Sequence, residues 1–416
     1  MNLFKKHPQI CILNWSWAIY FFLIIITGSV NLGANNWAHL YSFVFLMMAN
    51  LSYWFFNQRL QNAQKYEKTL STASDWPSFT SRIWWFLFVI YVISIVFHFY
   101  DKVYVMNLDY AGGICKAKLE WIRHGASRGG QVSSIWSVLG HLGSSLFFVF
   151  TYEWIRRSRR LVDILYYLAL FLYLLYCASI GNRSSIILFL FFALSVIILY
   201  RYQFRQAIIK ILPTLVLIIG FVFYIFMDRA RCENYQQSIT QLSLQQVNTY
   251  KNSFQKSLNF NSDSDWIDQF WQSHQVLSLT QLSIYYITHT QNVFAEVINT
   301  PERPGQNLIN SLVVWVKKAG IDIEPQARSF QGRLLHLPGS FYYSYGLVGM
   351  IIGSLIFGLL LVLVSRLSCY LFDIHILVLL TCFLSPLSSP ANFIMFPSIL
   401  IALAVLLNLK KWLYQR

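Results

Sequence analysis

Long apolar runs separated by short polar stretches dominate the hydrophobic pattern of this chain. About ten of these runs approach or reach the length of roughly 20 residues that an α-helix needs to cross the hydrocarbon core of a bilayer. They cover residues 13–32, 38–56, 83–100, 133–153, 161–179, 184–200, 208–227, 341–364, 369–388 and 393–409. The pattern therefore predicts an all-α polytopic membrane protein with about ten transmembrane helices.

Two polar segments are too long to be simple connectors between neighbouring helices. One runs from about residue 101 to 131, and the other from 228 to 340. They divide the chain into spans one to seven (1–227), a large loop (228–340), and spans eight to ten with a tail (341–416). Within the large loop, amphipathic spacing over 265–286 and 306–318 predicts helices.

The basic residues indicate how the helices are oriented. The net charge is +15, and among the short loops the lysines and arginines gather in every second one, with three more in the C-terminal tail. Because short cytoplasmic loops carry the excess of lysine and arginine, both termini are expected in the cytoplasm and both long polar segments outside. This distribution also accounts for the high charge without nucleic acid, which is not an expected partner.

Arginines gather at the ends of the outside segments, where an unpaired charge beside the membrane is costly. Arg229 and Arg231 follow the seventh span, and Arg328 and Arg333 precede the eighth. Arg183 lies in a short turn between two apolar runs. A guanidinium group matches phosphate oxygens in a two-point contact, so the cluster predicts binding of a diphosphate at the membrane surface. For any single arginine, the alternative to diphosphate binding is that the side chain anchors the helix end to lipid headgroups.

Few groups are candidates for moving a proton. His336 lies between Arg333 and a Pro-Gly pair just before the eighth span, and Asp101 and Asp228 each open an outside segment. These three are the candidate general acids or bases. Other ionisable residues near span ends are expected to be satisfied or interfacial: His98, His141, Asp163, Asp373 and His375. No HExxH, GxSxG, paired-aspartate or P-loop motif occurs, so neither a metal nor a cofactor is expected.

Several of these features resemble the Wzy-type O-antigen polymerases. The similar stretches are Gly181-Asn182-Arg183-Ser184-Ser185, residues 100–113, and Leu337-Pro338-Gly339-Ser340 with the glycines that follow. Arg328 and Gly339 have the arginine-x10-glycine spacing associated with the outside loops of that family. Lys102 and Gly113 have the same spacing, with lysine in place of arginine, which weakens two-point phosphate binding there.

The resemblance implies a GT-C-like architecture and a glycosyl transfer at the periplasmic face of the bacterial inner membrane. Oligosaccharide repeat units linked to undecaprenyl diphosphate would be both donor and acceptor, and membrane lipids and a chain-length regulator are further partners compatible with this role. On this basis Arg328 and Arg333, then Arg183, Arg229, Arg231 and Lys102, would bind the diphosphate, and His336, Asp101 or Asp228 would serve as the base. The product would be O-antigen or a capsular polysaccharide.

Two other functions fit much of the same pattern. An O-antigen ligase has the same architecture and the same donor, but it transfers the glycan to lipid A core. A flippase for lipid-linked glycans would be expected to have short loops and a cation-lined cavity within its spans. The long outside segments of this chain favour an enzyme over a flippase.

Overall fold

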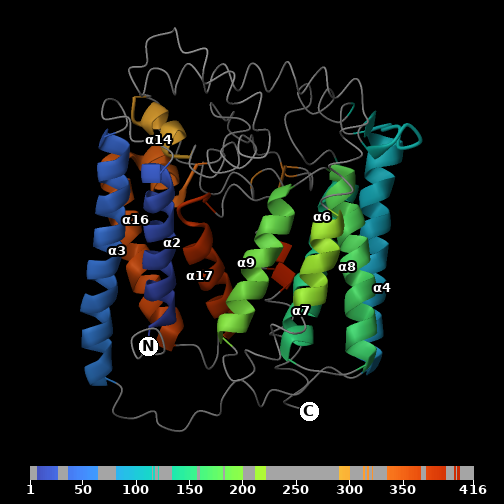
Figure 1. Ribbon diagram of the computed structural model, residues 1–416, viewed down its shortest axis with the longest axis horizontal. Helices are drawn as coiled ribbons and strands as arrows, with labels where there is room; N and C mark the ends of the chain where they lie inside the picture. Colours follow the sequence, from blue (N-terminus) through green and yellow to red (C-terminus); the bar gives the residue numbers. More distant parts are fainter. Residues whose placement is uncertain are drawn as a thin grey trace. The chain divides into compact units, whose positions relative to one another are not determined.

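A computed structural model of the chain consists of α-helices, one π-helix and connecting turns among the residues it describes (Figure 1). The described residues are 7–26, 36–63, 81–114, 116–117, 120, 134–156, 160–180, 183–199, 211–221, 290–299, 313, 316–317, 321, 335–366, 372–389, 398–399 and 401–402. The structure therefore confirms the all-helical fold class for the described part of the chain.

Within these residues, five apolar segments are long enough to cross a membrane, consistent with a helical membrane protein. They are Pro8–Ile25, Ser81–Val105, Ile135–Ile155, Leu161–Ser179 and Leu337–Ser365. Three further apolar helices are shorter: Ser185–Ile198, Ile211–Phe221 and His375–Leu384. The predicted number of ten spans, the orientation of the termini and the expected helices over 265–286 and 306–318 are left as predictions. Those two segments lie wholly or mostly outside the described residues.

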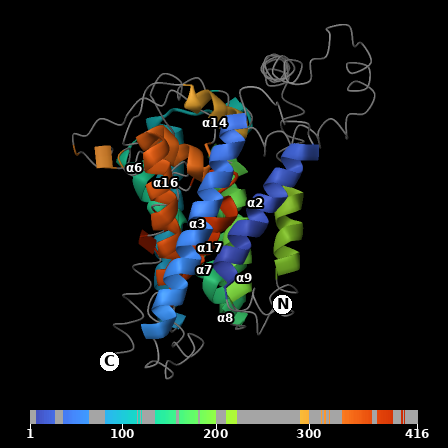
Figure 2. The same cartoon turned by 90° about the vertical axis from the view of Figure 1, so that its left-hand side faces the viewer.

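Contacts divide the chain into two compact units, which are described separately below. The first unit contains α2 (Pro8–Ile26), α3 (Asn36–Ala63), α14 (Thr290–Ile298), α16 (Leu337–Arg366) and α17 (Phe372–Leu384). Helix α3 lies along α16, α2 packs on α17, and α14 covers one end of α3 and α16 (Figures 1 and 2). Segments from both ends of the sequence therefore build one helical bundle.

Helix α16 bends sharply at Gly346, whose φ of 70° and ψ of −165° lie outside the helical region. The rings of Phe341 and Phe357 both stack on Phe45, with centroids 6.2 and 6.1 Å away. Since 16 positions separate Phe341 from Phe357, a straight helix would hold them about 24 Å apart. The segment before Gly346 must therefore fold back along the segment after it.

Two glycines make this fold-back possible. A Cβ atom at Gly353 would lie 2.5 Å from the ring of Phe341, and one at Gly349 would overlap the Cβ atom of Tyr345. The spacing of the two glycines places both on one helix face, which permits close approach of a second helix. A third glycine, Gly358, makes the close contact of α16 with the backbone of α3 at Ala49.

The second unit contains α4 (Ser81–Tyr100), the π-helix η2 (Asp101–Val105), α6 (Ile135–Ser144), α7 (Leu146–Arg156), α8 (Arg160–Ile180) and α9 (Arg183–Leu199). Helix α4 packs on α6 and α8, and α7 packs on α8 and α9. Stacked aromatic rings fill the interior, including Trp154 on Tyr166 at 3.9 Å and Phe147 on Tyr173 at 4.2 Å between centroids. These large, closely packed rings form the interior of the second unit. The polar groups described below lie at the C-terminal end of α4.

Helices α4 and α6 approach closely because α6 presents glycines to α4. A Cβ atom at Gly140 would lie 2.8 Å from that of His98, and one at Gly143 would overlap Ser94. Beyond this contact the α-helix gives way to the π-helix, which ends with a bond from Met106 N–H to Asp101 C=O of 2.9 Å. Helices of this kind often mark functional positions.

Candidate functional site

Most of the predicted phosphate-binding residues lie outside the described part of the chain. These are Arg328, Arg333, Arg229 and Arg231, together with the candidate base Asp228. Arg183 is described only as the first residue of α9, without its side chain. The structure describes the side chains of the three remaining candidates: His336 in the first unit, and Asp101 and Lys102 in the second.

His336 caps the first turn of α16. Its Nδ1 atom accepts a hydrogen bond from Gly339 N–H at 3.0 Å, and its carbonyl accepts one from Ser340 N–H at 2.9 Å. The next amide, Leu337 N–H, donates to the carbonyl of Ser385 at 2.9 Å. Because Pro338 has no N–H, the first turn has no amide left to bind an anion.

The Nε2 atom of His336 faces Gln291 and Ser42. It lies 3.0 Å from Gln291 Oε1 and 3.3 Å from Ser42 Oγ. Since Nδ1 accepts the bond from Gly339, the imidazole is neutral with its hydrogen on Nε2, which donates to Gln291. Burial lowers the pKa of His336 to about 3. The arrangement is that of a structural histidine, whose two ring nitrogens both have partners.

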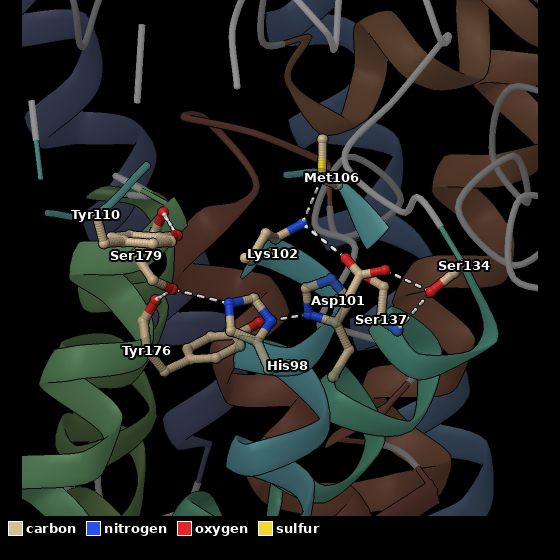
Figure 3. Close-up of polar contacts among 10 residues, drawn as sticks. His98, Asp101, Lys102, Met106, Tyr110, Ser134, Ser137, Tyr176 and Ser179 are labelled. Atoms are coloured by element: carbon tan, nitrogen blue, oxygen red, sulfur yellow. Dashed lines mark hydrogen bonds and ion pairs between the residues drawn. The ribbon is translucent and has the colours of Figure 1, made fainter. Parts of the chain in front are cut away.

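Asp101 and Lys102 form a buried ion pair at the start of the π-helix (Figure 3). Lys102 Nζ lies 3.2 Å from Asp101 Oδ2 and 3.3 Å from the thioether sulfur of Met106. Ser134, the N-cap residue of α6, donates its hydroxyl hydrogen to Asp101 Oδ1. Both charged side chains are fully buried, at 0% exposure. The two charged side chains thus form an ion pair inside the second unit, shielded from solvent.

His98, one turn before this pair, connects it to α8. Its Nε2 atom lies 2.8 Å from Ser179 Oγ, and its ring is 4.5 Å from that of Tyr176 (Figure 3). His141 of α6 also contacts Tyr176, through a hydrogen bond from its Nδ1 side. The result is a cluster in which two histidines, a carboxylate and an ammonium group belong to three neighbouring helical segments. We call these residues, with Ser134, Ser137 and Ser179, the α4 cluster.

A compact loop covers the end of the α4 cluster. Met106, Leu108 and Ala117 pack together with Tyr110, whose hydroxyl donates to the carbonyl of Ser179 at 3.1 Å. Asp109 accepts bonds from two backbone amides and from Lys116 Nζ at 2.6 Å. The bond from Lys116 holds the pKa of Asp109 below its usual value. The described beginning of the first polar segment is thus a defined structure and not a simple connector.

Sequence reasoning named Asp101 and Lys102 but did not predict that they pair with each other. The sequence pattern predicts that His98 and His141 are satisfied or interfacial, and no local pattern singles out Ser134, Ser137 or Ser179. One signal was available: the pair Gly140 and Gly143 on α6 brackets His141 and predicts close approach of a neighbouring helix.

Comparisons of the chain with protein-family models, with curated proteins and with solved structures find no match. Within the described residues, no group of three or more histidine, cysteine, aspartate or glutamate side chains is placed to hold a metal ion.

Proposed function

We propose that the chain is a membrane glycosyltransferase that polymerises oligosaccharide repeat units linked to undecaprenyl diphosphate. The reaction would take place at the periplasmic face of the bacterial inner membrane and yield O-antigen or capsular polysaccharide. The observation that carries this proposal is the buried Asp101–Lys102 pair, which ends an apolar helix where the first long polar segment begins. Ionisable side chains within a membrane segment are costly and usually serve function.

Two further features support the proposal. The described residues are all-helical and include five apolar segments of membrane-spanning length, as a substrate with a polyprenyl anchor would require. The stretches around Arg183, residues 100–113 and Leu337 resemble those of Wzy-type polymerases. The architecture and the lipid-diphosphate donor are shared with the O-antigen ligases, and deletion of the gene separates the two enzymes.

In the proposed reaction, a hydroxyl oxygen of the acceptor sugar attacks the anomeric carbon of the donor. The bond from that carbon to the diphosphate oxygen breaks, the lipid diphosphate leaves with the electron pair, and a base takes the hydroxyl proton. Arginines offset the charge of the leaving group. We assign this role first to Arg328 and Arg333, with Arg183, Arg229 and Arg231 next; these assignments stay predictions.

Deletion of the gene tests the proposed function directly. Surface polysaccharide from the deletion strain should show core carrying a single repeat unit, because polymerisation is lost while ligation continues. Bare core with long glycans still on the lipid carrier would indicate a ligase instead. Bare core with single repeat units retained on the carrier would indicate a flippase, and an unchanged ladder would exclude all three functions.

The leaving-group assignment is tested by Arg328→Ala. Long chains should disappear while the protein remains inserted in the membrane at its normal level. A matched control is Arg59→Ala, because Arg59 stacks on Phe55 within α3, away from the predicted outside segments. If chain length in the Arg328 variant equals that in the control, Arg328 does not bind the diphosphate.

A further inference from the structure

The outer face of α4 is a continuous apolar band with aromatic ends. Polar residues are exposed before Trp85 and again from Asn107 onward. Trp85 lies at one end of the band, and Tyr100 and Tyr104 lie at the other. The exposed residues between these ends carry only aliphatic or phenyl groups: Phe86, Val89, Ile90, Ile93 and Val96. The change from polar to aromatic to aliphatic and back therefore follows the helix from end to end.

A group of rings makes one aromatic end of this band wider than a single helix. Trp136 of α6 lies beside the end of α4, with its ring centroid 5.6 Å from that of Tyr100 and 5.0 Å from that of Phe97. The ring of Tyr104 lies 5.2 Å from that of Tyr100. Tyrosine and tryptophan are enriched where the hydrocarbon core of a bilayer meets its headgroups. We call Tyr100, Tyr104 and Trp136 the aromatic girdle of the second unit.

Helix α3 of the first unit has an exposed face of the same kind. Trp37 lies at one end of this face and Phe55 at the other, and the exposed residues between them are Leu40, Phe43, Met47 and Leu51. Beyond Phe55, the guanidinium group of Arg59 lies 4.7 Å from the centre of the Phe55 ring. Long cationic side chains near the end of a membrane helix lie along apolar groups in this way and keep their charge in water.

The two apolar bands have nearly the same length. In α4, 19 positions separate Trp85 from Tyr104, and in α3, 18 positions separate Trp37 from Phe55. At a rise of 1.5 Å per residue, these separations are roughly 28 and 27 Å. The hydrocarbon core of a bilayer is about 30 Å thick. Helices of two separate units therefore each match the thickness of a bilayer.

Side-chain size distinguishes the outer face of α4 from the face that packs on another helix. Where α4 meets α6, Ser94 lies against Gly143, and such small residues let two helices approach closely. The exposed residues between Trp85 and Tyr100 include no glycine, alanine or serine. Their bulky branched and aromatic side chains suit flexible acyl chains better than a closely packed helix.

We propose that the exposed faces of α4 and α3 contact the acyl chains of the bilayer, and that the aromatic girdle marks the boundary between acyl chains and headgroups. The partner is an ordinary bilayer lipid, so this inference does not depend on the proposed function. Asp101 and Lys102 lie between Tyr100 and Tyr104 in the sequence. Their buried ion pair therefore lies at the level of the headgroups, away from the bilayer centre, where charge is most costly.

Spin labels at single positions measure the depth of each face. The amino acid p-acetylphenylalanine is incorporated at one site at a time and coupled to a nitroxide, which avoids labelling the six native cysteines. The full-length protein is reconstituted in vesicles of phosphatidylcholine and phosphatidylglycerol. Collisions of the label with oxygen, which concentrates among acyl chains, are then compared with collisions with a water-soluble nickel chelate.

The expected depths follow from the proposed boundary. Labels at Ile93 and Met47 should collide mainly with oxygen, a label at Asn107 should collide mainly with the nickel chelate, and a label at Tyr104 should lie between them. Poor access of both reagents to Ile93 or Met47 would mean that protein covers that face, which overturns the proposed lipid contact. A label at Tyr104 as deep as one at Ile93 would overturn the position of the boundary.

Replacing all three girdle residues with leucine tests their anchoring role, because leucine has no preference for the interface. In this variant a label at Asn107 should lose collisions with the nickel chelate, since the end of α4 moves deeper. The control Val96→Leu alters the same face within the apolar band and should leave the label at Asn107 unchanged. Equal accessibility in the two proteins would show that the girdle is no anchor. If the triple variant fails to fold, Tyr104→Leu provides the measurement, because Tyr104 is 74% exposed.

Discussion

The two units of this protein each bury a histidine in a polar network, and the networks differ in how completely they are satisfied. Around His336 in the first unit, both ring nitrogens and all amides of the first turn of α16 have partners. Around His98 in the second unit, a ring nitrogen, a serine hydroxyl and an ammonium hydrogen do not. A fully satisfied buried network stabilises one conformation, whereas each buried polar atom without a partner carries a desolvation cost.

The strongest test of this comparison is the ion pair of the second unit. Lys102→Met leaves the buried Asp101 carboxylate without the opposite charge that pairs with it and should cost about 3–5 kcal/mol of stability. The combined variant Asp101→Asn with Lys102→Met removes both charges and should recover most of that loss. Thermal unfolding in nanodiscs measures both effects. Equal losses in the two variants would mean that the pairing of charges is not what stabilises this part of α4.

The fold-back of α16 provides the next test, now in the first unit. Gly353→Leu would place a side chain where the ring of Phe341 lies, and such overpacking typically costs about 1–3 kcal/mol. Gly220→Leu is the control, because a Cβ atom at Gly220 meets nothing within 4 Å. If the two variants unfold at the same temperature, the two segments of α16 are not packed against each other.

The pKa of His336 gives the comparison a pH dependence. Because its folded-state pKa is about 3 and its ordinary value is 6.5, the unfolded chain binds a proton between these values that the folded chain does not. The stability contributed by the neutral imidazole is complete above about pH 6.5 and is lost as the pH falls toward 3. Unfolding measured across this window should be less pH-dependent in His336→Asn than in the wild type.

The smallest expected effect concerns the cap that His336 forms. His336→Ala removes the acceptor for Gly339 N–H and should cost about 1 kcal/mol through the cap alone, while His336→Asn can still cap the helix and should cost less. Thermal unfolding at pH 7.5 separates the two. An alanine variant as stable as the asparagine variant would show that the hydrogen bond to Gly339 contributes nothing.

Hydropathy predicted the positions of several helices to within one or two residues. The expected spans 161–179 and 184–200 correspond to α8 at Arg160–Ile180 and α9 at Arg183–Leu199. It did not predict the break at Ser145 between α6 and α7 or the reversal at Gly346, because both occur inside apolar runs. Hydropathy averaged along the chain reflects only the amino-acid composition of a segment. These bends depend instead on backbone angles and on which side chains are in contact.

The candidate site was predictable only in part, for a related reason. Charged residues such as Asp101 and Lys102 stand out at the end of an apolar run, so sequence alone identifies them. His98 gains its character from neighbours far along the chain, including Ser179 on α8 and Gly140 on α6. The hydrogen of Ser179 goes to the carbonyl of Tyr176, so His98 donates from Nε2, and no local pattern of residues contains that information.

The reversal at Gly346 bears on how copies of this chain could associate. Two glycines four positions apart in a membrane helix usually indicate a face where helices of separate chains dimerise. Here Gly349 and Gly353 already contact Tyr345 and Phe341 of their own element. The outer surface of the same helix carries bulky aliphatic side chains, with Val348, Ile352 and Ile356 more than half exposed. This glycine motif therefore joins two parts of one subunit, and the surface that it leaves outward is suited to lipid tails.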